Sequence, residues 1–167
     1  YEGFGSGIVI PGTGIAMQNR GAGFINQPGH PNHLAGGKRP YHTIIPAFTT
    51  KNGAAHMSFG VMGGPMQPQG HLQVLSRVVA SGRDPQAALD APRWRVDGGL
   101  NVSVEPDTPP ATVTALQALG HDITVASQRD VSFGGGQAIL RMDHCWCGGS
   151  DGRRDGQVAG AASPRIV

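Results

Sequence analysis

Residues 60–75 read Gly-Val-Met-Gly-Gly-Pro-Met-Gln-Pro-Gln-Gly-His-Leu-Gln-Val-Leu, and this stretch predicts a strand, a tight turn and a helix in succession. The strand side is an apolar run over residues 54–61 that ends in two glycines. Residues 67–81 then follow a helical spacing, closed by Gly82 as a cap. The apolar side of this helix is expected to comprise Leu72, Leu75, Val78 and Val79.

The pair Gly63-Gly64 lies at the predicted strand-to-helix turn. Glycine adopts positive φ angles without steric cost, so a tight turn alone explains the pair. Two adjacent N–H groups without side chains can also point at one oxygen, as in an oxyanion hole for acyl transfer. A Gly64→Pro substitution, which removes one N–H group, is then predicted to cut turnover while leaving folding largely possible.

The elements before this stretch are predicted to be strands and one long loop. Residues 7–10 and 15–18 are short β runs around a Pro-Gly-Thr-Gly turn, and residues 21–37 form a glycine-rich loop. The apolar runs 43–49 and 54–61 flank an Asn-Gly dipeptide, which is a strong hairpin signal.

The elements after this stretch alternate between helix and strand. Asp84 and Pro85 are typical of a helix start, and Thr108 is expected to cap a third helix over residues 109–119. Strands are predicted over residues 101–104, 122–126 and 137–142, with one more over 158–160. The sequence therefore predicts a mixed α+β fold with largely antiparallel pairing, and residues 1–167 contain no evident interdomain linker.

Composition excludes several classes of function. The net charge is +2 and no basic stripe is interleaved with aromatic residues, so we expect no nucleic-acid partner. No apolar stretch approaches ~18 residues, so we expect no membrane span. Cys145 and Cys147 are too close for the usual zinc spacing, and the histidines are scattered, so we expect no metal and no other cofactor.

Several phrases of the chain together resemble the small subunit of the γ-glutamyltranspeptidase family, most of all its glutathione hydrolase-like and cephalosporin acylase branch. The resemblance extends from Tyr1 to about Gly160. The phrases are Phe4-Gly5-Ser6-Gly7-Ile8-Val9, Gly14-Ile15, Asn19, Lys38-Arg39-Pro40, Gly63-Gly64, Ala91-Pro92-Arg93, Ser150-Asp151 and Arg153.

The resemblance implies an N-terminal nucleophile hydrolase with an αββα sandwich, cleaved from a precursor. A threonine at the new N-terminus attacks the substrate, its own α-amino group acts as the base, and a large subunit from the same precursor completes the fold. The resemblance also assigns the oxyanion-hole N–H groups to Gly63 and Gly64. It places Arg20 and the segment Tyr41-His42-Thr43 at the pocket for the acyl group of a small-molecule amide, with Tyr1 beside it.

The chain departs from the family pattern in two places. Only three residues precede Phe4, and none aligns with the threonine, so we expect the nucleophile and the first strand upstream of Tyr1. In the pocket, the family's glutamine and acid fall on Arg20 and Gly23, and its two serines fall on His42 and Thr43. Because a buried ammonium needs a carboxylate partner, this pocket favours a glutaryl-like acidic acyl group over a γ-glutamyl group.

Plainer interpretations of the same residues remain open. Arg20 can be a solvated loop arginine, His42 an ordinary strand histidine, and Thr43 a strand-favouring β-branched residue. Arg93 is expected to bond backbone carbonyls or an acid, and Asp151 with Arg153 to stabilise a turn. The alternative function is a non-catalytic binding or assembly subunit of the same fold, which a missing upstream threonine would indicate.

Overall fold

The computed structural model describes residues 5–160 and divides the chain into two compact units, which meet between Ile44 and Ile45 in the sequence. In the first unit the two predicted β runs pair antiparallel through a single bridge between Val9 and Ala16. The predicted long loop contains a 3₁₀ helix, η1 (Arg20–Gly23), and a further bridge between Ile25 and His33. The prediction that residues 1–167 form one domain stays a prediction.

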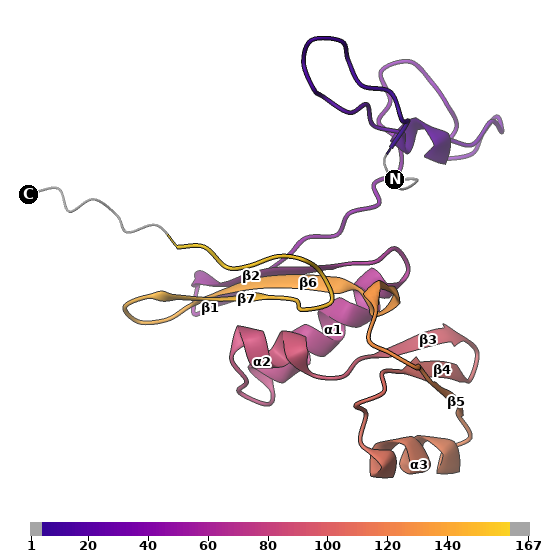
Figure 1. The fold of residues 1–167 in the computed structure, drawn as a ribbon. Helices are drawn as coiled ribbons and strands as arrows, with labels where there is room; N and C mark the ends of the chain where they lie inside the picture. The colour runs from indigo at the N-terminus through magenta and orange to yellow at the C-terminus, as the bar shows by residue number, and fades with distance from the viewer. Residues whose placement is uncertain (1–4, 161–167) are drawn as a thin grey trace, which may run out of the picture. The chain divides into compact units, whose positions relative to one another are not determined.

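A four-stranded antiparallel sheet is the centre of the second unit (Figure 1). Its order is β1 (Ala47–Lys51), β2 (Ala54–Met62), β6 (Gly135–Arg141) and β7 (Trp146–Ser150). The β1–β2 hairpin confirms the Asn-Gly prediction, because Asn52 and Gly53 both have positive φ, 53° and 77°.

Two helices, α1 (Met66–Val79) and α2 (Pro85–Asp90), cover one face of this sheet (Figure 1). Asp84 caps α2 as predicted, since its side chain accepts from the Ala87 N–H at 2.9 Å. The core between the helices and the sheet includes Met57, Phe59, Val61, Val74, Val78, Ala88, Leu89 and Ala138.

The predicted apolar side of α1 is partly wrong. Leu72 and Val79 are 55% and 61% exposed, whereas the buried side runs through Gly70 and Val74. Gly70 brings the helix so close to β2 that a Cβ atom there would lie 2.5 Å from Val61 Cγ1. This close approach sets the rotation of the helix, which apolar spacing alone did not indicate.

A second sheet has the order β3 (Trp94–Gly98), β4 (Asn101–Val104) and β5 (Asp122–Val125). The first pair is antiparallel, and β4 runs parallel to β5 across the helix α3 (Pro110–Ala118). Pro109 rather than Thr108 stands at the N-cap of α3, without a side-chain bond, so the predicted cap is wrong. The short helix η2 (Val131–Phe133) leads into β6.

Two strands were not predicted, and one predicted strand is absent. The sequence pattern gave no sign of β3 or β7, and residues 158–160 belong to no strand. Strand alternation places four exposed apolar side chains on the sheet face opposite α1 and α2. They are Phe48, Met62, Ile139 and Trp146. Within residues 5–160 no helix has the length and apolar character that crossing a membrane requires.

Candidate active site

The turn between β2 and α1 leaves the backbone N–H groups of Gly63 and Gly64 without an acceptor among the described residues. The Gly63 carbonyl accepts from the Met66 N–H at 3.1 Å, and the Gly64 carbonyl accepts from the Gln67 N–H at 3.0 Å. Because a trans peptide is planar, the Gly64 N–H points opposite to the Gly63 carbonyl, away from the first turn of α1. No acceptor for this N–H lies among the described residues. It is thus an available donor at a helix N-terminus, where the dipole favours negative charge.

Only glycine fits at Gly63, while Gly64 is open to solvent. Their φ angles are 144° and 58°. A Cβ atom on Gly63 would lie 3.1 Å from Gly134 Cα and 3.3 Å from Met66 Cβ, whereas one on Gly64 would meet nothing within 4 Å. The predicted tolerance of Gly64→Pro is wrong, because proline fixes φ near −65° and would break this turn.

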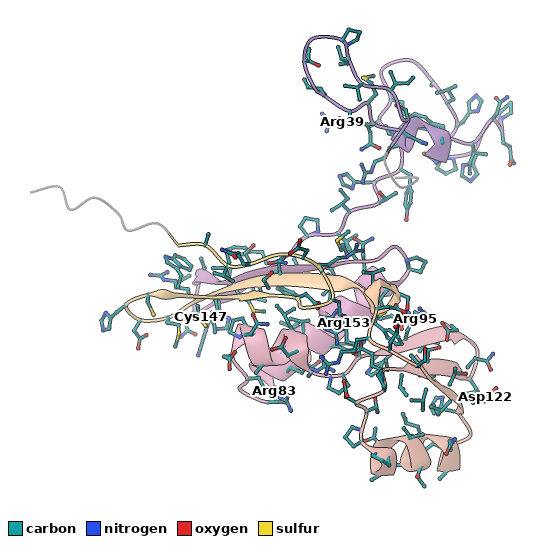
Figure 2. The ribbon with its side chains drawn as sticks, viewed as in Figure 1. Arg39, Arg83, Arg95, Asp122, Cys147 and Arg153 are labelled. Carbon is teal, nitrogen blue, oxygen red and sulfur yellow. The ribbon has the colours of Figure 1, made fainter. Side chains whose placement is uncertain are left out.

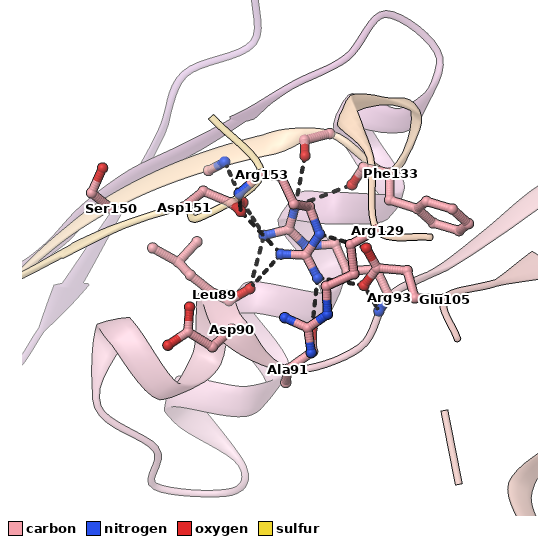
Figure 3. A network of polar contacts seen from close by, with 12 residues as sticks. Leu89, Asp90, Ala91, Arg93, Glu105, Arg129, Phe133, Ser150, Asp151 and Arg153 are labelled. Carbon is pink, nitrogen blue, oxygen red and sulfur yellow. Dashed lines mark hydrogen bonds and ion pairs between the residues drawn. The ribbon is translucent and has the colours of Figure 1, made fainter. Parts of the chain in front are cut away.

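Behind the turn, the start of β6 is bonded to the buried Arg93 (Figure 3). Its Nη1 atom donates to the carbonyls of Phe133 and Gly134 at 3.1 and 3.0 Å. Its Nη2 atom donates to Asp151 Oδ2 at 2.6 Å, and both side chains have no exposed surface. The expectation that Arg93 bonds backbone carbonyls or an acid is confirmed, and the structure shows both kinds of bond.

A second arginine completes the network. Arg153 donates to Asp151 Oδ1 at 3.0 Å and to both carboxylate oxygens of Glu105. Glu105 in turn accepts from the Arg93 backbone N–H at 2.7 Å. The predicted Asp151–Arg153 pair is confirmed, within a group of two arginines and two carboxylates whose charges cancel. Glu105 was not predicted, since an isolated acid after a short strand carries no sequence signal.

The charges of this network shift the pKa values of its members. Burial acts to raise the pKa of Asp151, but the Arg153 N–H, the Arg93 guanidinium and the Gly136 N–H outweigh it and lower that pKa. Burial and the charge of Arg153 together lower the pKa of Arg93, against the opposing effect of Asp151. Burial, followed by repulsion from Arg93, lowers the pKa of the nearby Arg77 to about 10.

The first unit brings two of the predicted pocket residues together. Arg20 Nε donates to Thr43 Oγ1 at 2.8 Å, and no partner among the described residues occupies the two terminal nitrogens of Arg20. His42 Nδ1 accepts from the Ile44 N–H at 3.1 Å, which leaves the proton of a neutral ring on Nε2. Tyr1 lies outside the described residues. Gly63 and Gly64 belong to the second unit.

Residues 5–160 contain no cluster of three or more side chains that could hold a metal ion. Cys145 is exposed and Cys147, labelled in Figure 2, is half-buried, and both are free thiols. Sequence reasoning also missed the run Gly134-Gly135-Gly136, although three glycines before an apolar strand are a visible signal of close packing.

Comparisons with known proteins agree with this geometry. A family model described as gamma-glutamyltranspeptidase matches residues 1–161. The chain is 37% identical to an oxamate amidohydrolase proenzyme of Klebsiella pneumoniae and 35% identical to a glutathione hydrolase-like proenzyme of Bacillus subtilis, with 96% of the chain covered in each case. A cephalosporin acylase structure from Bacillus halodurans is 52% identical over 96% of the chain, with a TM-score of 0.83.

The chain is shorter than these proteins. It spans 31% and 32% of the length of the two curated relatives and 30% of the acylase chain. The fold similarity confirms the predicted class, an α+β fold of the αββα type.

Proposed function

The chain belongs to the γ-glutamyltranspeptidase family, and from that premise we propose that its protein hydrolyses amides of acidic acyl groups, glutaryl-like or γ-glutamyl, or passes the acyl group to an amine. The observation that carries the proposal is the free Gly64 N–H at the strand-to-helix turn, next to Gly63. A donor held in place before reaction stabilises negative charge that develops only in the transition state.

The proposed reaction proceeds through an acyl-enzyme. A threonine upstream of Tyr1 attacks the amide carbon through its hydroxyl oxygen, and its α-amino group takes the hydroxyl proton. The N–H groups of Gly63 and Gly64 stabilise the oxyanion. Collapse expels the amine, which takes the proton back from the α-amino group. Water or an acceptor amine then attacks the ester and regenerates the threonine. No step calls for a cofactor.

The donors of the first unit support an acidic acyl group. Arg20 offers two terminal nitrogens in a planar fork, held by the bond from Nε to Thr43, and this geometry suits a carboxylate. His42 adds an Nε2–H donor. The Klebsiella pneumoniae relative is named for oxamate, whose acyl group also carries a carboxylate. We propose that Arg20, His42 and Thr43, with Tyr1, bind the acid end of the substrate.

The proposed partner is a large subunit from the same precursor. Relatives named as proenzymes are about three times as long as this chain, so most of such a protein lies outside it. The sheet face opposite α1 and α2 exposes Phe48, Met62, Ile139 and Trp146, and an apolar face of this kind needs a cover. We propose that a second sheet from the precursor covers it.

The first test is mass and N-terminal analysis of the protein expressed from its complete gene. We expect two polypeptides, the smaller beginning with threonine upstream of Tyr1. The matured protein is then assayed on matched glutaryl and γ-glutamyl p-nitroanilides, and we expect higher kcat/KM for the glutaryl amide. A strong preference for the γ-glutamyl amide would remove the acidic-pocket proposal. Lack of a processed threonine and of turnover on either amide would support the non-catalytic binding subunit instead.

A further inference from the structure

We propose that Arg93 is a positioning residue for the Gly63-Gly64 turn and acts on it through the backbone of Gly134. The inference rests on the proposed function, in which that turn supplies the oxyanion donors. Arg93 does not contact the substrate, because its side chain is fully buried.

The turn packs directly against the start of β6. A Cβ atom on Gly63 would lie 3.1 Å from Gly134 Cα, so the two backbones are in contact without side chains between them. Gly135 also pairs with Met62, the residue before the turn. A Cβ atom on Gly134 would lie 2.8 Å from the Met62 carbonyl oxygen. A displacement of Gly134 therefore moves Gly63 as well, because no flexible side chain lies between the two backbones.

Arg93 and Asp151 hold the same segment from below (Figure 3). Arg93 Nη1 donates to the carbonyls of Phe133 and Gly134, and Asp151 Oδ2 accepts from the Gly136 N–H at 2.7 Å. The Asp151 N–H returns a bond to the Gly136 carbonyl at 3.1 Å. The chain on either side of Gly135 is thus fixed by a single buried ion pair.

A guanidinium is the group that this arrangement requires. Arg93 donates to two carbonyls with one nitrogen and to Asp151 and the Leu89 carbonyl with the other, in one plane. A lysine ammonium is a single point of charge and cannot span both sites. Packing alone does not account for a buried ion pair, since apolar side chains of similar volume generally stabilise a core at least as well.

Arg153 provides a matched control within the same network. It is also buried, also bonds Asp151 and also donates to the Leu89 carbonyl, but it has no bond to Phe133 or Gly134. Arg93→Lys and Arg153→Lys therefore both keep the charge and both change a contact of Asp151, but only the first removes the bonds to the carbonyls of Phe133 and Gly134.

The experiment compares these two variants as full-length, matured proteins at a temperature where both are folded. Because a shift of reacting groups by ~1 Å can cost ~10²-fold in rate, we expect Arg93→Lys to lower kcat by about that factor with little change in KM. Arg153→Lys should lower kcat less than ~10-fold. Hydrogen exchange of a peptide spanning residues 60–67 should rise in Arg93→Lys only.

Equal losses of kcat in the two variants, or unchanged exchange at residues 60–67 in Arg93→Lys, would overturn the proposal. If Arg93→Lys does not accumulate as folded protein, Asp151→Glu takes its place. The added methylene shifts the guanidinium while keeping the ion pair, and the same loss of kcat is expected. A wild-type protein that hydrolyses no acidic amide would refute the proposed function, whereas the exchange measurement would still decide whether Arg93 positions the turn.

Discussion

Arg93 and Asp151 meet at 2.6 Å with no exposed surface on either side chain, and this pair joins the end of α2 to the start of β6 and the end of β7. A buried ion pair contributes little net stability compared with apolar packing, but it is costly to leave half of it in place. The role of the pair is therefore to fix geometry, and its removal has measurable consequences.

Asp151→Asn should destabilise the protein strongly. The substitution leaves Arg93 buried with its charge uncompensated, and breaking such a pair typically costs ~3–5 kcal/mol. Urea denaturation followed by fluorescence measures the loss. The control is Asp107→Asn, which breaks an exposed pair with Arg129 and should cost ~0–1 kcal/mol. Similar losses in the two variants would contradict the role assigned to Asp151.

Stability should fall in acid through the same carboxylate. The pKa of Asp151 is lowered in the folded state, because bonds from Arg153, Arg93 and Gly136 outweigh the effect of burial. Its contribution is therefore fully present above the unfolded-state pKa of about 3.9 and is lost as pH falls through the lower folded value. Melting temperatures between about pH 3 and about pH 6 test this. The wild type should lose more stability over that range than Asp151→Asn does.

The two glycines of the turn should respond differently to substitution. Gly63→Ala forces a side chain against Gly134 and Met66 at a φ of 144°, so we expect turnover to fall by ~10²-fold or more. Gly64→Asn meets open space at a φ of 58°, which asparagine tolerates, and should cost ~1 kcal/mol of stability or less. Thermal denaturation measures the stability of both variants, and steady-state kinetics measures their kcat. A Gly63→Ala variant with wild-type turnover would take Gly63 out of the mechanism.

Arg20 should determine the preference for an acidic acyl group. Charge-assisted hydrogen bonds contribute ~1.5–3 kcal/mol, so Arg20→Met should lower kcat/KM on a glutaryl amide by about 10–100-fold. A neutral butyryl amide should be hydrolysed at nearly the wild-type rate. Arg39→Met, in the same unit and without a bonded partner among the described residues, is the control and should leave both rates unchanged. Equal losses on the acidic and neutral amides would show that Arg20 is structural.

Gly70→Ala should destabilise the protein despite the better helix propensity of alanine. A Cβ atom there would lie 2.5 Å from Val61 Cγ1, and overpacking of ~1–3 kcal/mol exceeds the ~1 kcal/mol gained in propensity. Adding Val61→Ala should recover part of the loss, because the smaller side chain makes room. A double-mutant cycle in urea measures this coupling, and strictly additive losses would argue against the contact.

Local sequence signals were sufficient for part of the fold. Asn52-Gly53 specified the β1–β2 hairpin because few other dipeptides adopt two successive positive φ angles. Asp84 and Pro85 specified the start of α2, because a cap and a preset φ act within one turn. The Gly63-Gly64 turn was located for the same reason.

The strands β3 and β7 depended on distant partners. The β7 sequence Trp-Cys-Gly-Gly-Ser has a low strand propensity, and it forms a strand because β6 pairs with it and Gly149 lets the start of α2 pack closely. β3 is held by Gln69 and Gln73, whose side chains bond the backbone of Val96 and Trp94.

By itself, the sequence determined the family, the mixed α+β class and the position of the glycine turn, because these depend on residues close together in the chain. The tertiary structure alone decided which donors the turn leaves free and what holds them in place. Glu105, Gly134 and Asp151 are separated by 12 to 58 residues from Arg93, which bonds all three, and no local pattern specifies such contacts. These contacts matter because the charged side chains are buried. A charge removed from water is costly unless it meets a counterion, and the fold decides which residue that counterion is.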